Sequence, residues 1–278
     1  MLKPKIISNT KNRKRSFATQ RSFAHTMWQG NMEIRSQLIA ASISMNALGI
    51  NQGTSGNLSS RVEGGFLITP SGIPYASLTP VDIAFVDLPS PATTSTDSDS
   101  GYCGPLQPSS EWRMHRDVYL NFPNCMSIVH THSPYATALS SLRKQIPAFH
   151  YMVGVAGGKS IPCAEYRTFG TQSLSDEIVS TLKEHKVTGC LLANHGVICY
   201  TSKIDVNKTI GVAVEIETLA KQYHLAKSFN LGEPHILDDA EMDIILAKFA
   251  TYGKKEEEVA CLCEFDQLNR IVSPEKRG

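Results

Sequence analysis

Hydrophobic residues recur at helical intervals near both ends of the folded part of the chain. A first helix is predicted to begin after the N-cap residue Asn31 and to stop at Gly49. A last helix is predicted to begin at Asp238, where Glu241 completes a capping-box-like pair. The apolar positions of these two helices are Ile34, Leu38, Ala41, Met45 and Leu48, and Met242, Ile245, Leu246 and Phe249.

Between these helices the pattern alternates between strand-like and helix-like segments. Short runs rich in β-branched residues predict strands, and Leu174, Ile178 and Leu182 form one face of a helix. Asp205 caps a longer helix marked by an apolar stripe. We therefore predict one α/β domain over residues 31–253. The predicted strands are 66–69, 83–88, 127–132 and those within 189–200; a further helix is 134–142, and the stripe after Asp205 is Val206, Ile210, Ala213, Ile216, Ala220 and Tyr223.

Three segments lack this patterning. Residues 89–108 are rich in Ser, Thr, Pro and Asp and have almost nothing to bury, so they predict a mobile surface insertion. Residues 254–278 form a charged C-terminal tail. Residues 1–30 are basic, and residues 1–32 hold seven Lys or Arg and no acidic residue. They are either a disordered tail or a targeting segment, so the expected location is the cytoplasm or, with a transit peptide, a mitochondrion or other organelle.

Composition and charge exclude several classes of protein. The 278 residues are 41% hydrophobic, which is ordinary for a globular protein, and no apolar run approaches the roughly 18 residues of a membrane-spanning helix. The net charge of +1 provides no global field for nucleic acid or anionic lipid. The seven cysteines include no CxxC pair, so reduced thiols are favoured over a disulfide framework. Cys261 and Cys263 lack partners for a metal site.

Three histidines on strand-like segments are candidate metal ligands. Residues two apart in a strand project from the same face, so His130 and His132 can approach one ion. Such a pair also occurs by accident on a half-exposed strand. His195 precedes Gly196 at a predicted sharp bend, and its alternative role is that of a hydrogen-bonded core histidine. The other histidines fall in the tail, in helices or in loops: His25, His115, His150, His185, His224 and His235.

Other local patterns suggest an anion site. Ser109, Ser110 and Glu111 lie at a predicted helix start, where free N–H groups attract anions, although a simple N-cap explains them equally well. The glycine turns 53–57 and 69–72 offer hydroxyls and N–H groups for a phosphate, or are ordinary turns. Only three residues separate Gly154 from Gly158, where a P-loop needs four, so ATP binding is rejected.

Eight motifs appear together in an order that resembles the class II aldolase/adducin family. Within the family they are most similar to the aldolases that act on L-fuculose 1-phosphate. The resemblance covers residues 31–253 and omits most of the 89–108 insertion. The motifs are NQGTSGN at 51–57, ITPSGIPY at 68–75, SSEWR at 109–113, HTH at 130–132, IPAFHYM at 146–152, AGGKSIPC at 156–163, TFGT at 168–171 and NHG at 194–196.

The resemblance implies a fold and a reaction. The fold is a single domain with a central, mainly antiparallel β-sheet flanked by helices in three layers. The reaction is the reversible, zinc-dependent cleavage of a ketose 1-phosphate to dihydroxyacetone phosphate and a short aldehyde such as lactaldehyde, through a metal-stabilised enediolate. One Zn²⁺ per subunit, or another divalent transition metal, is expected. The expected partner is a small sugar phosphate, with neither nucleic acid nor membrane, and the expected assembly is a homotetramer with sites at subunit interfaces.

The resemblance also assigns site residues. His130, His132 and His195 are the expected metal ligands, and Glu111 is both a ligand of the empty site and the proton-transferring base. Tyr151 is expected to protonate the aldehyde oxygen, and Phe169 and Tyr252 to form the aldehyde-side wall, contributed by a neighbouring subunit. The expected phosphate-binding residues are Thr54, Gly56, Asn57, Ser71, Gly72, Ser109 and Ser110.

The same family leaves other reactions open. Its members include ketopentose-phosphate 4-epimerases, a dehydratase of a methylthio sugar phosphate and the non-catalytic adducins, because fold and metal ligands do not fix the reaction. Tyr151, the PSSEW motif at 108–112 and the TYG motif at 251–253 favour an aldolase over an epimerase. The presence of all three histidines and Glu111 argues against an adducin-like scaffold.

Overall fold

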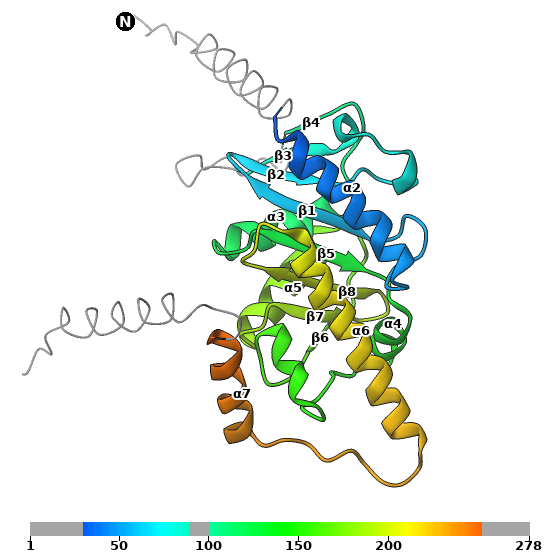
Figure 1. Cartoon of the computed structure of the whole chain (residues 1–278), viewed down its shortest axis with the longest axis vertical. Coiled ribbons are helices and arrows are strands. Elements are labelled where there is room, and N and C mark those ends of the chain that lie inside the picture. Colours follow the sequence, from blue (N-terminus) through cyan, green and yellow to red (C-terminus); the bar gives the residue numbers. More distant parts are fainter. Residues whose placement is uncertain (1–29, 89–100, 252–278) are drawn as a thin grey trace, which may run out of the picture.

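The computed structural model describes residues 30–88 and 101–251, which build one sheet covered by helices on both faces (Figure 1). The sheet has eight strands in the order β4-β3-β2-β1-β5-β8-β7-β6, and only the β6–β7 pair is parallel. The strands are β1 Asn57–Val62, β2 Gly65–Ile68, β3 Ala84–Asp87, β4 Tyr102–Cys103, β5 Ser127–Thr131, β6 Cys163–Ala164, β7 Gly189–Leu192 and β8 Gly196–Thr201. The helices are α2 Met32–Ala47, α3 Trp112–Asn121, α4 Pro134–Ser141, α5 Gln172–Glu184, α6 Val206–Ser228 and α7 Asp239–Thr251, with 3-10 turns η1 Tyr75–Ser77, η2 Pro80–Asp82 and η3 Tyr151–Ala156.

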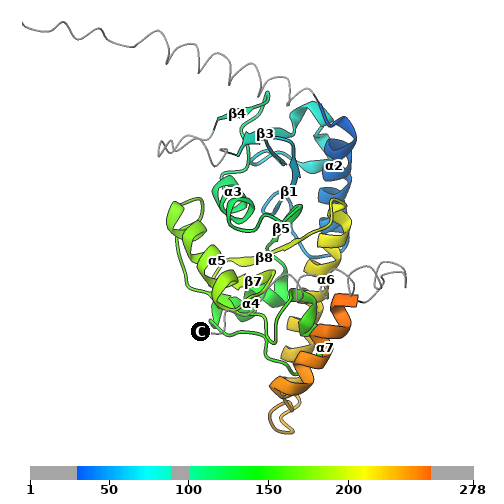
Figure 2. The same ribbon diagram turned by 90° about the vertical axis from the view of Figure 1, so that its left-hand side faces the viewer.

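The central strands are buried on both faces, because each face is covered by its own helices. In β2 the buried side chains alternate: Leu67 joins the core beneath α2 and α6, and Phe66 and Ile68 join the core beneath α3 and α5. Figure 2 shows the sheet between these two helical layers. The prediction of one α/β domain with a mainly antiparallel sheet in three layers is confirmed.

Most predicted helix ends agree with the local chemistry. Gly49 has a φ of +72°, and the N–H of Ile50 donates to the carbonyl of Met45 at 3.1 Å, which closes α2 with a left-handed cap. The carboxylate of Asp205 accepts the N–H of Asn207 at 3.0 Å. Asn31 differs from expectation: it precedes α2 but has a φ of +61°, and its side chain makes no capping hydrogen bond. The left-handed backbone turns its side chain away from the free N–H groups.

The predicted insertion is partly wrong. Residues 89–100 lie outside the described residues, but residues 101–108 have defined structure. Tyr102 and Cys103 pair with β3 as the edge strand β4, and Leu106 packs against the core. The N–H of Ser71 also donates to the carbonyl of Gln107 at 3.2 Å. Backbone pairing with an edge strand needs few apolar side chains, so composition alone does not reveal it.

The C-terminal end of the predicted domain and most of both tails lie outside the described residues. These are residues 1–29 of the basic segment and residues 252–278, which include Tyr252, Cys261 and Cys263. Among the helices that are described, none has both the length and the apolar character to span a membrane.

Candidate metal centre

Three sequence-distant elements meet beside the ends of the central strands β5 and β8. His130 lies in β5 and His132 directly follows it, while His195 lies in the three-residue turn between β7 and β8. β5 and β8 are neighbours, with Thr131 opposite Val197, so the β7–β8 turn lies beside the end of β5. Glu111 is the N-cap residue of α3. The fold therefore brings the three imidazoles and one carboxylate together.

The three imidazole rings form a regular triangle. Each pair of ring centroids is 4.9 Å apart, and the ring planes cross at 72° to 78°. The Nε2 atoms of His130 and His132 are 3.0 Å apart. One nitrogen from each ring and one oxygen of Glu111 all lie within 4.8 Å of one another, and these four residues form the metal cluster discussed below.

Glu111 bridges two of the imidazoles. Its Oε2 lies 3.2 Å from Nε2 of His130, and its Oε1 lies 3.1 Å from Nε2 of His195. Only 6% of its surface is exposed. Burial alone would raise the pKa of Glu111, but the charges and hydrogen bonds of His130 and His195 outweigh burial and hold the pKa well below its usual value. The carboxylate is therefore ionised.

The protonation of the histidines fits a divalent metal. The Nδ1 of His130 lies 2.8 Å from the carbonyl oxygen of Val197, which can only accept, so Nδ1 donates to this carbonyl and Nε2 faces the cluster. Burial, and then the charges of His130 and His195, lower the pKa of His132 to about 4, so this ring is neutral at pH 7. Among the described residues, Oε1 of Glu111 faces only Nε2 of His195, at 3.1 Å. Imidazole nitrogens and a carboxylate oxygen are the donor set that zinc and similar ions prefer.

Two glycines permit the backbone to approach the ligands. A Cβ on Gly196 would lie 2.3 Å from the carbonyl oxygen of Thr131 and 3.0 Å from Cδ2 of His132. A Cβ on Gly56 would lie 2.5 Å from the carbonyl oxygen of His130. Such distances are too short for any larger residue, so β1, β5 and β8 can converge here only with glycine at these positions.

Hydrogen bonds to Thr69 connect the loops that carry the expected phosphate-binding residues. The carbonyl of Thr69 accepts the N–H of Ser109 at 3.0 Å, and its hydroxyl accepts the N–H of Leu58 at 3.2 Å. The hydroxyl of Ser109 accepts the N–H of Glu111 at 3.2 Å. Among the expected phosphate residues, Gly56, Asn57 and Ser109 are buried, whereas those on the surface are Thr54, Ser71, Gly72 and Ser110.

The expected aldehyde-side residues lie outside the metal cluster. Tyr151 is 52% exposed on η3 and stacks on His150 with 4.9 Å between ring centroids. Phe169 is 64% exposed, on a loop whose Gly170 carbonyl accepts from the guanidinium of Arg113 at 3.4 Å. Tyr252 is not among the described residues.

His115 is a site residue that the sequence patterns did not predict. Its Nε2 lies 2.6 Å from Oδ1 of Asn57, whose amide nitrogen donates to Oε2 of Glu111 at 2.9 Å. The available signal was spacing, because His115 follows Glu111 by four residues and therefore shares its helix face.

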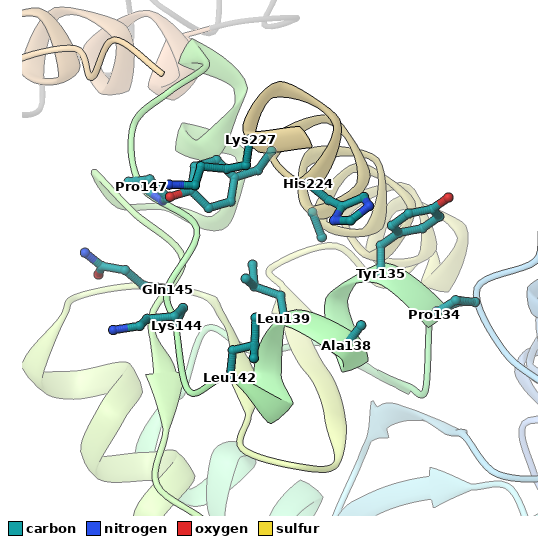
Figure 3. Close-up of a pocket in the computed structure, with 12 residues that line it drawn as sticks. Pro134, Tyr135, Ala138, Leu139, Leu142, Lys144, Gln145, Pro147, His224 and Lys227 are labelled. Carbon is teal, nitrogen blue, oxygen red and sulfur yellow. The ribbon is translucent and has the colours of Figure 1, made fainter. Parts of the chain in front are cut away.

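A cavity of about 790 Å³ lies elsewhere, between α4, α6 and the loop after α4 (Figure 3). Leu139, Leu142, Tyr135 and Tyr223 line it, with Lys144 and Lys227 at its edge. None of the four cluster residues lines this cavity. Its volume therefore has no part in the chemistry of the metal cluster.

Comparisons with known proteins agree with this geometry. Residues 36–224 match the family model described as "Class II Aldolase and Adducin N-terminal domain". The chain is 44% identical over 220 residues to a 5-methylthioribulose-1-phosphate/5-deoxyribulose-1-phosphate aldolase of Rhodospirillum rubrum, covering 79% of this chain and 92% of the relative. It is 42% identical over 222 residues to L-fuculose phosphate aldolase of Escherichia coli, covering 80% and 96%. A solved L-fuculose 1-phosphate aldolase superposes with a TM-score of 0.72 at 33% identity, covering 80% of this chain and 98% of that chain.

Proposed function

Since this chain belongs to the class II aldolase and adducin family and its relatives are aldolases, we propose that it cleaves a ketose 1-phosphate to dihydroxyacetone phosphate and a short aldehyde. The observation that carries the proposal is the cluster of His130, His132, His195 and Glu111. An aldehyde-lyase of this class needs a metal site next to a base, and these four side chains could supply both.

Two kinds of relative match almost equally well, and the substrates in their names differ in the part that becomes the aldehyde. L-Fuculose 1-phosphate, which yields lactaldehyde, is our first candidate substrate, supported by the 42% identical relative. The 44% identical relative supports a second candidate, a ketopentose 1-phosphate with a methylthio or deoxy terminus. Both candidates share the phosphorylated three-carbon end, so one phosphate and metal site serves either.

The proposed roles of the cluster follow from its donor atoms. His130, His132 and His195 would hold one divalent ion, for which we propose zinc, and Glu111 would complete the empty site. The bound ion would supply Lewis acidity, which lowers the cost of negative charge on the substrate oxygens. In the direction of bond formation, Glu111 accepts the proton that the carbon next to the carbonyl loses, and its ionised state makes it ready to do so.

The proposed phosphate site consists of the loops joined at Thr69. The side chains of Thr54, Ser71 and Ser110 are exposed there, so their hydroxyl groups can contact an incoming anion. The phosphate contributes binding energy away from the reacting carbons and orients the substrate. The remaining proposed contributors are Gly56, Asn57, Gly72 and Ser109.

We propose that a second subunit completes the site. Tyr151 would protonate the aldehyde oxygen, and Phe169 would form part of the aldehyde wall, together with Tyr252. The high exposure of Tyr151 and Phe169 in a single chain supports their use in an assembly. The proposed assembly is a cyclic homotetramer, in which the aromatic residues of one subunit face the metal cluster of the next.

The test combines metal analysis with a substrate panel. The purified protein should contain about one zinc per chain, lose activity with a chelator, and release dihydroxyacetone phosphate from ketose 1-phosphates but not from 5-phosphates. An isomeric sugar phosphate without release would favour the epimerase, and loss of water from the substrate would favour the dehydratase. Absence of bound metal, together with no activity after zinc is added, would favour the adducin-like scaffold and contradict the proposal.

A further inference from the structure

We infer that His115 is a positioning residue that, through Asn57, fixes the orientation of the Glu111 carboxylate. The inference rests on the proposed function of Glu111 as the base. His115 is not one of the four cluster residues, and its hydrogen bonds go to Asn57 and Ser59.

A continuous chain of hydrogen bonds connects Glu111 to the far end of α3. Asn57 Nδ2 lies 2.9 Å from Glu111 Oε2, and His115 Nε2 lies 2.6 Å from Asn57 Oδ1. Ser59 Oγ then lies 2.7 Å from His115 Nδ1 and 2.8 Å from the hydroxyl of Tyr119. All five side chains are buried, and His115 and Ser59 have no exposed surface. Water therefore cannot replace any of these partners.

The spacing of the five residues explains how the chain of hydrogen bonds forms. Glu111, His115 and Tyr119 are four residues apart on α3, an advance of about 6 Å along the helix. Asn57 and Ser59 are two residues apart on β1, an advance of about 6.8 Å along the strand. The two distances nearly match, so every fourth residue of a helix that lies along a strand can contact every second residue of that strand.

The orientation of the Asn57 amide fixes the direction of the hydrogen bonds along the chain. Its nitrogen lies 2.9 Å from Oε2 of Glu111, and its carbonyl oxygen lies 2.6 Å from Nε2 of His115. His115 must then carry its proton on Nε2, and its Nδ1 accepts from the hydroxyl of Ser59. Ser59 in turn accepts from Tyr119.

This direction has a consequence for the base. Asn57 holds Oε2 of Glu111, whereas Oε1 lies 3.1 Å from Nε2 of His195. Without the donor on His115, nothing holds the Asn57 carbonyl oxygen away from Glu111, so the amide can rotate and the carboxylate loses the Asn57 hydrogen bond. We therefore expect His115 to affect the chemical step more than substrate binding.

A purely structural histidine would behave differently. A buried, fully hydrogen-bonded histidine that only fills space would reduce stability when replaced and leave the turnover of the folded enzyme unchanged. The test must therefore separate turnover from stability and from metal content.

The first measurement needs no substrate. In the full-length protein labelled with ¹⁵N-histidine, we expect His115 to remain neutral with its proton on Nε2 between pH 6 and 8, because burial, followed by the charge of His130, lowers its pKa to about 3. A proton on Nδ1, or a charged ring, would overturn the inference irrespective of any activity.

The second measurement uses two substitutions at one position. His115→Phe keeps a ring but removes both nitrogens, and we expect kcat to fall by roughly 10–100-fold, as is usual when a hydrogen-bond partner behind a ligand is lost. The KM should change by less than about twofold, and zinc should remain near one per chain. His115→Gln restores a donor near the Nε2 position and should recover part of kcat.

The matched control is Asp117→Asn on the same helix. Asp117 is buried but bonds to Gln172 and Ser175 of α5, on the opposite side of α3 from Asn57. Its kcat should stay within about twofold of the wild type, because distant sites act independently. Unchanged kcat in both His115 variants would overturn the inference, and so would an equal loss in His115→Phe and Asp117→Asn.

Failure of the inference and failure of the proposed function can be distinguished. If wild-type protein releases no dihydroxyacetone phosphate, the proposed function fails, and the histidine tautomer still tests the arrangement. If the wild type is active and the His115 variants match it, only the inference fails. If His115→Phe does not fold, the comparison of His115→Gln with wild type and the tautomer measurement decide it.

Discussion

At the scale of single residues, the metal cluster depends on which nitrogen of each imidazole carries the proton. The Nδ1–H group of His130 donates a hydrogen bond to the carbonyl of Val197, and burial keeps His132 neutral. The Nε2 atoms of His130 and His132 lie 3.0 Å apart, so a proton or a cation is needed between them. These four side chains could therefore hold a metal ion.

Replacing one imidazole should empty the site. We expect His132→Ala to lower zinc content from about one per chain to near zero after dialysis, because two imidazoles and one carboxylate lack the usual set of ligands. Elemental analysis measures this, with His185→Gln as control, because His185 is exposed at the end of α5. Full zinc retention in His132→Ala would contradict the proposed ligand set.

His115 should make the folded state sensitive to acid. Its pKa is about 3 in the folded protein and about 6.5 when unfolded, so below pH 6.5 only the unfolded chain takes up the proton. Stability should therefore fall as the pH drops from 6.5 toward 4, by up to about 1.4 kcal/mol per pH unit from this group.

The variant His115→Gln lacks this proton uptake and should show a shallower fall. Urea unfolding of both proteins between pH 7 and pH 4, in the presence of a chelator so that metal release does not contribute, measures the difference. Parallel pH dependence in the two proteins would show that His115 does not stay neutral in the fold.

At the scale of elements, the tight β7–β8 turn is what positions His195. Asn194 adopts a left-handed φ of +54°, and Gly196 passes close to the backbone of β5. The sequence predicted a bend at this position and strands within residues 189–200. It could not indicate that β8, rather than another strand, lies next to β5, because strand order depends on which apolar faces pack against which helices.

We expect Gly196→Ala to disturb both stability and metal binding. The added Cβ would lie 2.3 Å from the Thr131 carbonyl, so β5 and β8 must separate, and overpacking of this kind costs about 1–3 kcal/mol. Thermal unfolding and zinc affinity should both fall. The matched control is Gly211→Ala in α6, where the new Cβ meets no atom within 4 Å and should stabilise the helix by about 0.5–1 kcal/mol. Equal effects of the two substitutions would contradict this account.

At the scale of the whole molecule, one sheet places the metal cluster at its centre and leaves Tyr151 and Phe169 on the surface. The cluster joins residues from β5, the β7–β8 turn and α3, whereas the aromatic residues belong to η3 and to the loop before α5. A single chain therefore holds the proposed base and the proposed acid in separate regions, and an assembly of chains would unite them.

Mixing two inactive variants tests whether sites are shared. We expect Glu111→Gln and Tyr151→Phe each to lower kcat by at least about 100-fold, since each removes a proton-transfer group. When the two variants are unfolded together and refolded, some sites would combine an intact Glu111 with an intact Tyr151 of a neighbour, and activity should reappear. Light scattering should give the mass of four chains. No recovery in a confirmed mixed assembly would contradict sites at subunit interfaces.

The sequence by itself determined the periodic elements and most of the side chains that can take part in metal binding or proton transfer. Period-two and helical spacings predicted β5, α4, α5 and α6, because each depends on neighbours along the chain. Only the tertiary structure decided which of those residues meet. Three features depend on long-range packing: the edge strand β4, the neighbouring positions of β5 and β8, and the alignment of α3 with β1 that connects His115 to Glu111. Their stability comes from contacts between residues that are far apart in the sequence, so no local pattern indicates them.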